Sequence, residues 1–192
     1  IQFTLSTPFD ISEATFLTNS FCNVGSEATD GTTIKFNSDG TKFFLADMTS
    51  DDVEIYSLTT AYDVSTCVSQ GNKSFTLDSS PNLRAITFSN DGKNIFLLDK
   101  AGGGHIFQYS LSSPFDLSNE TLVKNFSPSG GLNANGGDVR GIAFSSDGSK
   151  MFITSGEGDT INEYSLSIPF NLTGNVTHDG FYNTSDELQQ VW

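Results

Sequence analysis

The fold is indicated by Ile34-Lys35-Phe36-Asn37-Ser38-Asp39-Gly40-Thr41-Lys42-Phe43, because the pattern of this segment returns twice further along the chain. In each copy an apolar strand ends in Phe, a polar pair precedes Asp-Gly, a second apolar run follows, and Tyr-Ser-Leu comes next. The Phe residues that end the first strands are Phe36, Phe88 and Phe144, so the spacings are 52 (88 − 36) and 56 (144 − 88). The chain is therefore an array of one repeated unit.

A period near 50 residues, made of short strands and tight turns, is typical of a propeller blade. The sequence predicts an all-β protein of four-stranded antiparallel blades, about three and a half of them, within a larger propeller or repeat array. The predicted single repeat region, 1–192, divides into a partial blade in residues 1–30, blades in 31–82, 83–138 and 139–186, and the first strand of a further blade in 187–192.

The two ends of the chain fall out of phase with the repeat. Residues 3–10 match residues 109–116, which follow the second strand of a blade, and residues 186–192 match residues 137–143, which open one. Apolar strands of an incomplete blade would leave about 1.5–3 kcal/mol per large side chain unrealised. We therefore expect both ends to be completed by a longer chain or by self-association with a neighbour.

The repeat resembles the propeller repeats of the NHL and YVTN type. It is more similar still to uncharacterised environmental, marine and bacterial, repeat proteins that carry apolar-x-Phe-x-x-Asp-Gly-x-Lys-aromatic followed by Tyr-x-Leu. Here that run is Ile34 to Phe43, followed by Tyr56-Ser57-Leu58 and Tyr62-Asp63-Val64-Ser65. The resemblance covers nearly the whole chain and implies a propeller, a fold that serves enzymes, binding proteins and scaffolds alike.

The composition of the chain argues against two classes of partner, nucleic acid and membrane. The formal net charge of −14 repels a phosphate backbone, so we expect no nucleic-acid partner. No run of 18 apolar residues occurs, so we expect no membrane insertion.

Two cysteines, Cys22 and Cys67, are too few for a disulfide scaffold and fit no metal-ligand spacing. They do not occupy equivalent positions of the repeat. A disulfide between them and two separate buried thiols remain open alternatives.

Asn-x-Ser/Thr sequons occur outside the two inner strands of each predicted blade. Because this places them on the outer rim, we expect N-linked glycosylation at some of them. The candidate sites are Asn72, Asn119, Asn125, Asn171, Asn175 and Asn183.

Catalytic chemistry finds little support in the sequence. His105 and His178 have no Ser or Cys partner at a recognisable spacing, and Gly-x-Ser-x-Gly does not occur. The loops that enter the inner strands carry scattered acids, so calcium, which needs several converging oxygens, is not expected. These loop acids are Glu27, Asp30, Asp78, Asp138, Asp186 and Glu187. We therefore expect no catalytic, metal or cofactor site.

These observations favour a non-enzymatic extracellular glycoprotein, structural or adhesive, secreted or displayed at the cell surface, which polymerises into a filament. The first alternative is a lectin-like propeller that binds carbohydrate through aromatic pockets. The second alternative is a lactonase-like hydrolase with a metal ion in its channel.

Overall fold

The computed structural model describes residues 1–77, 81–128, 138–156 and 158–184, and these residues form three four-stranded antiparallel sheets and one two-stranded sheet. The first sheet contains β3 (Gly31–Phe36), β4 (Lys42–Asp47), β5 (Asp52–Leu58) and β6 (Cys67–Ser74). The second contains β7 (Leu83–Phe88), β8 (Asn94–Asp99), β9 (His105–Leu111) and β10 (Glu120–Phe126). The third contains β11 (Val139–Phe144), β12 (Lys150–Ser155), β13 (Thr160–Leu166) and β14 (Val176–Asn183). The two-stranded sheet contains β1 (Phe3–Leu5) and β2 (Ala14–Phe16).

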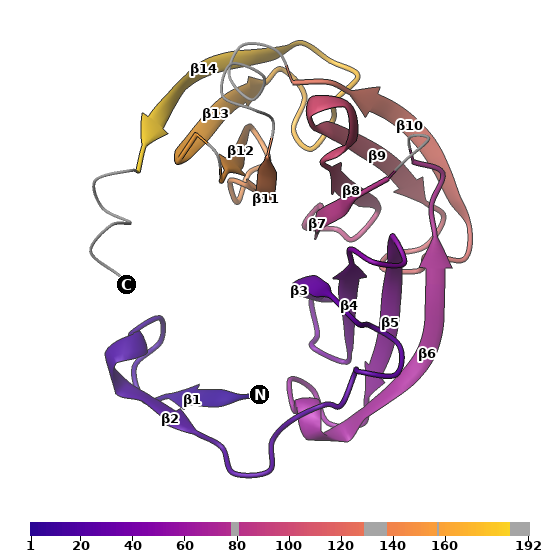
Figure 1. The fold of residues 1–192 in the computed structure, drawn as a ribbon, viewed down its shortest axis with the longest axis vertical. Helices are drawn as coiled ribbons and strands as arrows, with labels where there is room; N and C mark the ends of the chain where they lie inside the picture. The colour runs from indigo at the N-terminus through magenta and orange to yellow at the C-terminus, as the bar shows by residue number, and fades with distance from the viewer. Residues whose placement is uncertain (78–80, 129–137, 157, 185–192) are drawn as a thin grey trace.

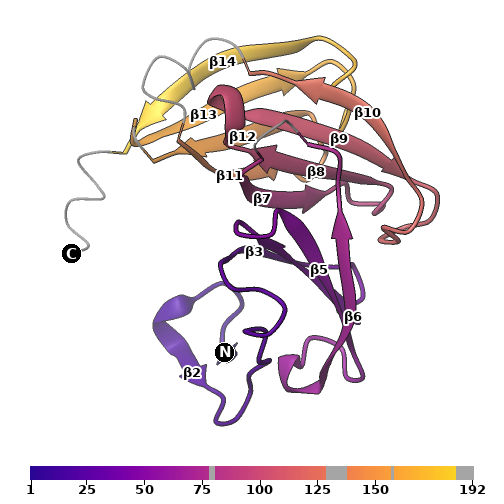
Figure 2. The ribbon, with the colours of Figure 1, turned by 45° about the vertical axis from the view of Figure 1, so that its right-hand side comes forward.

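Each four-stranded sheet is a meander in which sequential strands are neighbours. The sheets follow one another around an arc, with β3, β7 and β11 at its inner edge and β6, β10 and β14 at its outer edge (Figures 1 and 2). This is the arrangement of propeller blades, so the all-β propeller prediction is confirmed. We call these sheets blade 1, blade 2 and blade 3, and β1 with β2 the half-blade. The strand predicted in residues 187–192 lies outside the described residues.

Only three short 3-10 turns interrupt the strands of the described chain: η1 (Ile11–Glu13), η2 (Val64–Thr66) and η3 (Ala101–Gly103). None of the helical segments in those residues has the length and apolar character needed to cross a bilayer.

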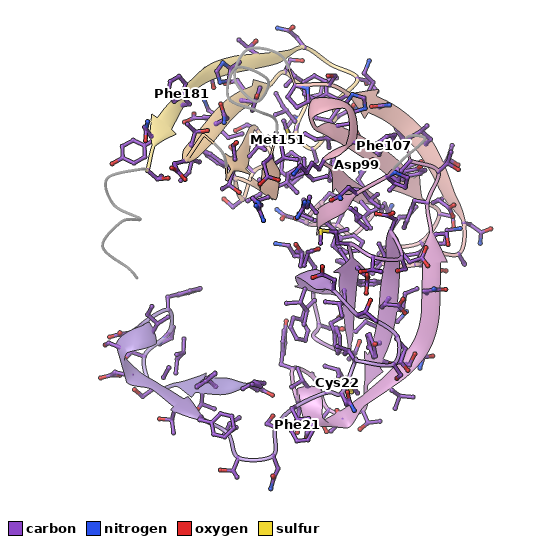
Figure 3. All side chains as sticks on the ribbon, viewed as in Figure 1. Phe21, Cys22, Asp99, Phe107, Met151 and Phe181 are labelled. Atoms are coloured by element: carbon purple, nitrogen blue, oxygen red, sulfur yellow. A yellow bond between two sulfur atoms is a disulfide. The ribbon has the colours of Figure 1, made fainter. Side chains whose placement is uncertain are left out.

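The core lies between the blades. Phe44 of blade 1 packs with Leu97, Phe107 and other apolar side chains of blade 2, all fully or almost fully buried. Phe96 of blade 2 packs in the same way with Met151 and its neighbours in blade 3. Figure 3 shows Phe107 and Met151 within these layers. Because each blade buries its apolar faces only against its neighbours, the blades stabilise one another.

The Asp-Gly turns are longer than a two-residue hairpin, since five residues separate β3 from β4. In blade 2, Gly92 has φ +69°, and the ring of Phe115 lies over it. Phe115 itself has φ 56°, and its N–H donates to the Gly92 carbonyl at 2.9 Å. The glycine is required because a Cβ at Gly92 would lie 2.3 Å from the Phe115 ring. Tyr62 over Gly40 and Phe170 over Gly148 repeat this contact.

One side-chain amide bridges blades 2 and 3. Gln108 of β9 donates from Nε2 to the Phe170 carbonyl at 3.2 Å and accepts from the Leu172 N–H at 2.8 Å. Both partners lie in the connection between the third and fourth strands of blade 3. The bridge therefore satisfies a backbone donor and an acceptor between two packed sheets.

The half-blade is joined to blade 1 by the same type of bridge. Gln2 donates to the Tyr62 carbonyl at 2.7 Å and accepts from the Val64 N–H at 3.2 Å. Gln2 therefore makes the contacts in blade 1 that Gln108 makes in blade 3, and β1 occupies the place of a third strand beside blade 1.

Candidate functional site

Every inner strand contains one β-bulge close to its first residue. The register between β7 and β8 skips Arg84, the register between β11 and β12 skips Arg140, and that between β3 and β4 skips Thr32. A bulge re-aims the side chain of the extra residue and is frequent beside functional sites. Because β7 and β11 lie side by side at the inner edge of the arc, two of these three bulges bring an arginine to the same region (Figure 1).

The two bulge arginines meet at one carboxylate. Asp138, directly before β11, lies 2.8 Å from Lys100 Nζ and 3.8 Å from Arg84 Nη2, and it pairs with Arg140. The Asp138 side chain is only 5% exposed, whereas that of Arg140 is 56% exposed. We call these four residues the Asp138 cluster. It gathers three of the nine Lys and Arg residues of a strongly acidic chain.

The Asp138 cluster is cationic and keeps unused donors. Burial works to raise the pKa of Asp138, but hydrogen bonds from Lys100 and Arg140 and their charges outweigh it and hold the pKa below its ordinary value. Asp138 is therefore ionised at neutral pH, and three cations with one carboxylate leave a net charge of +2. The Nε of Arg84 is buried and has no hydrogen-bond partner among the described residues. Such a cluster is suited to bind an anion.

The other acids near the inner strands have backbone partners instead. Asp47, which ends β4, accepts from the N–H groups of Asp30, Thr49 and Ser50 at 3.2, 2.6 and 3.1 Å. Asp99, which ends β8, accepts from Asn82 and Ala101 N–H at 2.8 and 2.9 Å. These carboxylates therefore fix the loops between strands.

Within the part of the chain that the structure describes, no three His, Cys, Asp or Glu side chains converge as metal ligands. Glu27 and Asp30 lie in the segment that precedes β3 of blade 1, whereas Asp138 directly precedes β11 of blade 3. Asp78, Asp186 and Glu187 lie outside the described residues.

The two histidines lie in different blades. His105 begins β9 and its ring lies 6.2 Å from that of Phe107. His178 lies on outer strand β14, with Nε2 3.3 Å from Asn162 Oδ1 and its ring 5.0 Å from that of Tyr164.

The six sequon asparagines occupy the outer strands or the turns beside them. Asn72 and Asn125 lie in β6 and β10, Asn183 ends β14, and Asn119, Asn171 and Asn175 precede β10 or β14. All are exposed except Asn171, which is half-buried. Glycosylation at these positions stays a prediction.

Cys22 and Cys67 form a disulfide across a sequence separation of 45 residues. Cys67 begins β6 of blade 1, whereas Cys22 lies in the segment that follows the half-blade (Figure 3). The bond therefore ties the N-terminal segment to blade 1. It resolves the alternatives that the sequence left open.

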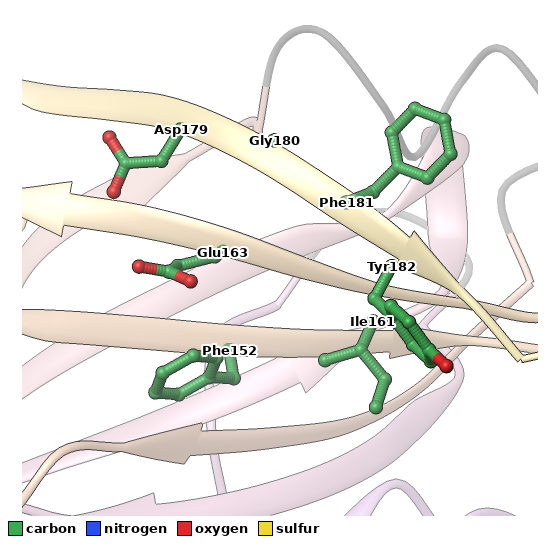
Figure 4. A pocket seen from close by; sticks show the side chains of 7 residues that line it. All are labelled: Phe152, Ile161, Glu163, Asp179, Gly180, Phe181 and Tyr182. Atoms are coloured by element: carbon green, nitrogen blue, oxygen red, sulfur yellow. The ribbon is translucent and has the colours of Figure 1, made fainter.

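A surface hollow of about 420 Å³ lies on the open face of blade 3. Phe152, Ile161, Glu163 and Asp179 line it beside the exposed Phe181 and Tyr182 of β14 (Figure 4). In blade 2, Phe96 and Ile106 occupy the positions that correspond to Phe152 and Ile161. Blade 3 covers Phe96 and Ile106. This face is therefore a blade-packing face, and its aromatic side chains are explained without a ligand.

Comparison with solved structures shows the fold. The chain is 15% identical to a periplasmic gluconolactonase of Pseudomonas aeruginosa, with a TM-score of 0.57 over 80% of this chain and 39% of that one. It is 14% identical to a protein assigned as a 6-phosphogluconolactonase of Bacteroides fragilis, with a TM-score of 0.57 over 90% of this chain and 42% of that one. It is 18% identical to a protein assigned as a 6-phosphogluconolactonase of Bacteroides uniformis, with a TM-score of 0.55 over 95% of this chain and 50% of that one. The chain thus spans half or less of these proteins. No protein-family model and no curated protein matches it.

These comparisons correct the function expected from the sequence. The interpretation as a non-enzymatic structural or adhesive protein, with its filament and cell-surface assignments, is wrong, because the propellers that the fold matches include proteins named as lactonases. The physical reason for the error is that a repeat dictates the packing between blades, whereas function depends on single side chains that the repeat does not specify.

The sequence places Asp138 among scattered loop acids and does not predict its three cationic partners. A signal was present: Arg84 and Arg140 stand 56 residues apart (140 − 84), the same offset as Phe88 and Phe144. An arginine repeated in phase, in a chain with only nine basic residues, marks a position where charge is needed. The bulge that aims it becomes visible only in the strand register.

Proposed function

We propose that the chain is part of a lactonase-like propeller in which the Asp138 cluster binds a sugar-derived lactone and stabilises the charge that develops during its hydrolysis. The observation that carries the proposal is the concentration of Arg84, Lys100 and Arg140 around one buried carboxylate at the inner edge of blades 2 and 3. The lactonases among the structural neighbours support it. Within this fold we propose the YVTN type of repeat.

The chemistry explains why cations are useful. Water adds to the lactone carbonyl and gives up a proton to solvent, the carbonyl oxygen becomes an oxyanion, and the ring C–O bond then breaks. The ring oxygen takes up a proton from solvent, and the new carboxylic acid releases its proton, so that the product is a hydroxy acid whose carboxylate is negative. Preorganised cations stabilise both the oxyanion and the carboxylate more than the neutral substrate. Asp138 is a positioning residue in this scheme, because it holds the three cationic groups together.

We also propose an oxidising compartment outside the cytoplasm. The Cys22–Cys67 disulfide supports this location, because such bonds persist where thiols are not kept reduced. Binding of carbohydrate in another form, such as a glycan, stays a prediction.

The test is lactone hydrolysis by the 192-residue chain and its Lys100→Met variant. Opening of glucono-lactone and of its 6-phosphate is followed by acid release, and the spontaneous rate is subtracted. We expect Lys100→Met to lower kcat/KM by about tenfold for each substrate, because one of three stabilising cations is lost. Lys124→Met, on the exposed face of outer strand β10, is the matched control and leaves the rate unchanged. Equal rates in the two variants, or no rate above the spontaneous one, would overturn the proposal.

A further inference from the structure

A glutamine carboxamide joins neighbouring sheets at two interfaces of the described chain. Gln108 donates to the Phe170 carbonyl at 3.2 Å and accepts from the Leu172 N–H at 2.8 Å. Gln2 makes the same pair of contacts with the equivalent connection of blade 1. In both cases the carbonyl belongs to the aromatic residue at positive φ, and the N–H belongs to the residue two positions later. This connection therefore presents an acceptor and a donor at the spacing of a single carboxamide.

The interface between blades 1 and 2 lacks this carboxamide. Ile55 of β5 stands at the position of Gln108, because each comes directly before the Tyr-Ser-Leu of its third strand. Neither the Phe115 carbonyl nor the Leu117 N–H of blade 2 has a hydrogen-bond partner among the described residues. Leu117 is only 2% exposed. A donor and an acceptor in such a place favour a bound group that completes both hydrogen bonds.

A hollow of about 200 Å³ lies at this place in the interface. Ile55 of blade 1 and Phe115 and Leu117 of blade 2 all line it. The side chain of isoleucine has no terminal amide, so the position that the Gln108 carboxamide takes at the next interface falls within the hollow. A cavity of about 150 Å³ holds benzene, whereas sites for drug-sized ligands begin near about 300 Å³. The hollow therefore suits a molecule only a little larger than benzene.

The charged side chains around the hollow balance one another. Lys73 lines the hollow and forms an ion pair with Glu120 at 2.7 Å. Lys42 and Asp116 line it as well. Hydrogen bonds from Ser118, together with the charge of Lys42, lower the pKa of Asp116, so this carboxylate is ionised beside a cation at neutral pH. Two cations and two carboxylates leave no net charge, and this balance favours a neutral ligand over an ion.

We propose that this hollow is a binding site for a small, neutral primary carboxamide. The N–H of the ligand donates to the Phe115 carbonyl, and its oxygen accepts from the Leu117 N–H, as Gln108 does in the next interface. Ile55 provides an apolar wall for the rest of the ligand. A carboxylate is disfavoured because it has no hydrogen to donate to the Phe115 carbonyl. The inference does not depend on the proposed hydrolysis.

The test titrates the 15N-labelled 192-residue chain with propionamide and follows each backbone N–H by NMR. The chain is produced in a host that adds no glycans, because the sequon residue Asn72 also lines the hollow. We expect a saturable shift of the Leu117 N–H signal. Propionate and N,N-dimethylpropionamide have nearly the same shape but no N–H, so each should bind at least tenfold more weakly.

A variant of the chain supplies the carboxamide itself. Ile55→Gln should abolish propionamide binding and raise the thermal midpoint, because its own amide completes the two hydrogen bonds. Val68→Gln is the matched control, since Val68 is 51% exposed on β6 of the same blade, and this variant should bind propionamide like the unchanged chain. Equal affinity for the three probes, no shift at Leu117, or unchanged binding by Ile55→Gln would overturn the proposal and leave water as the occupant. The comparison of probes uses the unchanged chain and therefore decides the matter even if Ile55→Gln does not fold.

Discussion

The interface between blades 1 and 2 and the interface between blades 2 and 3 follow one plan but satisfy different polar groups. At the second interface Gln108 bridges to Phe170 and Leu172, whereas its counterpart at the first is Ile55, beside a hollow of about 200 Å³. At the first interface the Tyr109 hydroxyl donates to the Thr76 carbonyl. At the second, the equivalent Tyr164 hydroxyl is buried with no partner among the described residues.

The repeat therefore dictates the backbone and the apolar layers, while single polar positions vary from one interface to the next. Dispersion and burial act over the whole blade face, so most aliphatic exchanges are tolerated. A buried amide or hydroxyl contributes only where a partner lies within hydrogen-bonding distance. Substitutions at equivalent positions of the two interfaces therefore separate the contribution to stability that the repeat provides from the contribution of single polar side chains.

The largest effect is expected at the feature that all complete blades share, the glycine under the aromatic residue. Gly92→Ala forces a Cβ into positive φ and 2.3 Å from the Phe115 ring, so we expect a loss of about 3–4 kcal/mol in the free energy of unfolding. Gly71→Ala is the matched control: its φ is +88°, but nothing lies within 4 Å of the added Cβ. It should cost about 1–2 kcal/mol in urea denaturation. Equal losses would show that the ring contact does not matter.

The next effect is specific to the interface of blades 2 and 3. Gln108→Met keeps the length of the side chain but leaves the Leu172 N–H and the Phe170 carbonyl without their partner. We expect a loss of about 2–3 kcal/mol, measured by urea denaturation. Gln70→Met, at an exposed position of β6, should change stability by less than about 0.5 kcal/mol. A loss at Gln108 no larger than at Gln70 would contradict a structural role for the bridge.

Smaller effects on stability are expected for substitutions of Tyr109 and Tyr164, which occupy equivalent positions at the two interfaces. Tyr109→Phe removes the hydroxyl that donates to Thr76 and should cost about 1 kcal/mol. Tyr164→Phe removes a buried hydroxyl without a described partner and should leave stability unchanged or raise it slightly. Thermal and urea unfolding of both variants measure the difference. If Tyr164→Phe destabilises more than Tyr109→Phe, the two interfaces do not differ as described.

The sequence predicts the blades, but it does not predict the polar contacts between them. The Phe and Asp-Gly spacings predicted the blades, because the strand and turn preferences of these residues are local. The bridge of Gln108 could not be predicted, because its partners are backbone groups 62 and 64 residues away. The same holds for the Asp138 cluster: the charges are visible, but their meeting depends on bulges and on the packing of two blades. Non-local contacts between unlike residues leave no period in the sequence.

The smallest expected effect concerns pH and the turns themselves. The hydroxyl of Ser145 and the N–H and hydroxyl of Ser149 donate to Asp147 and lower its pKa from 3.8 to about 2. A carboxyl whose folded pKa lies below its unfolded value stabilises the fold above the unfolded pKa, and this contribution is lost as pH falls through the folded pKa. We therefore expect stability to fall between pH 4 and pH 2, and we expect Asp147→Asn to make that fall shallower in urea denaturation.

The pKa of Glu54 is shifted in the opposite direction from that of Asp147, so its effect on stability has the opposite pH dependence. Burial on β5, followed by the charge of Asp52, raises the pKa of Glu54 above 4.5. Its contribution is fully present below pH 4.5 and is lost as pH rises through the higher folded pKa, because the ionised form is disfavoured in the folded chain. Glu54→Gln should therefore reduce the loss of stability on going from pH 4.5 to pH 7, a range in which Asp147→Asn leaves the slope unchanged. If both substitutions change the slope in the same pH range, the turn carboxylate and the buried carboxylate do not differ in the way that their surroundings require.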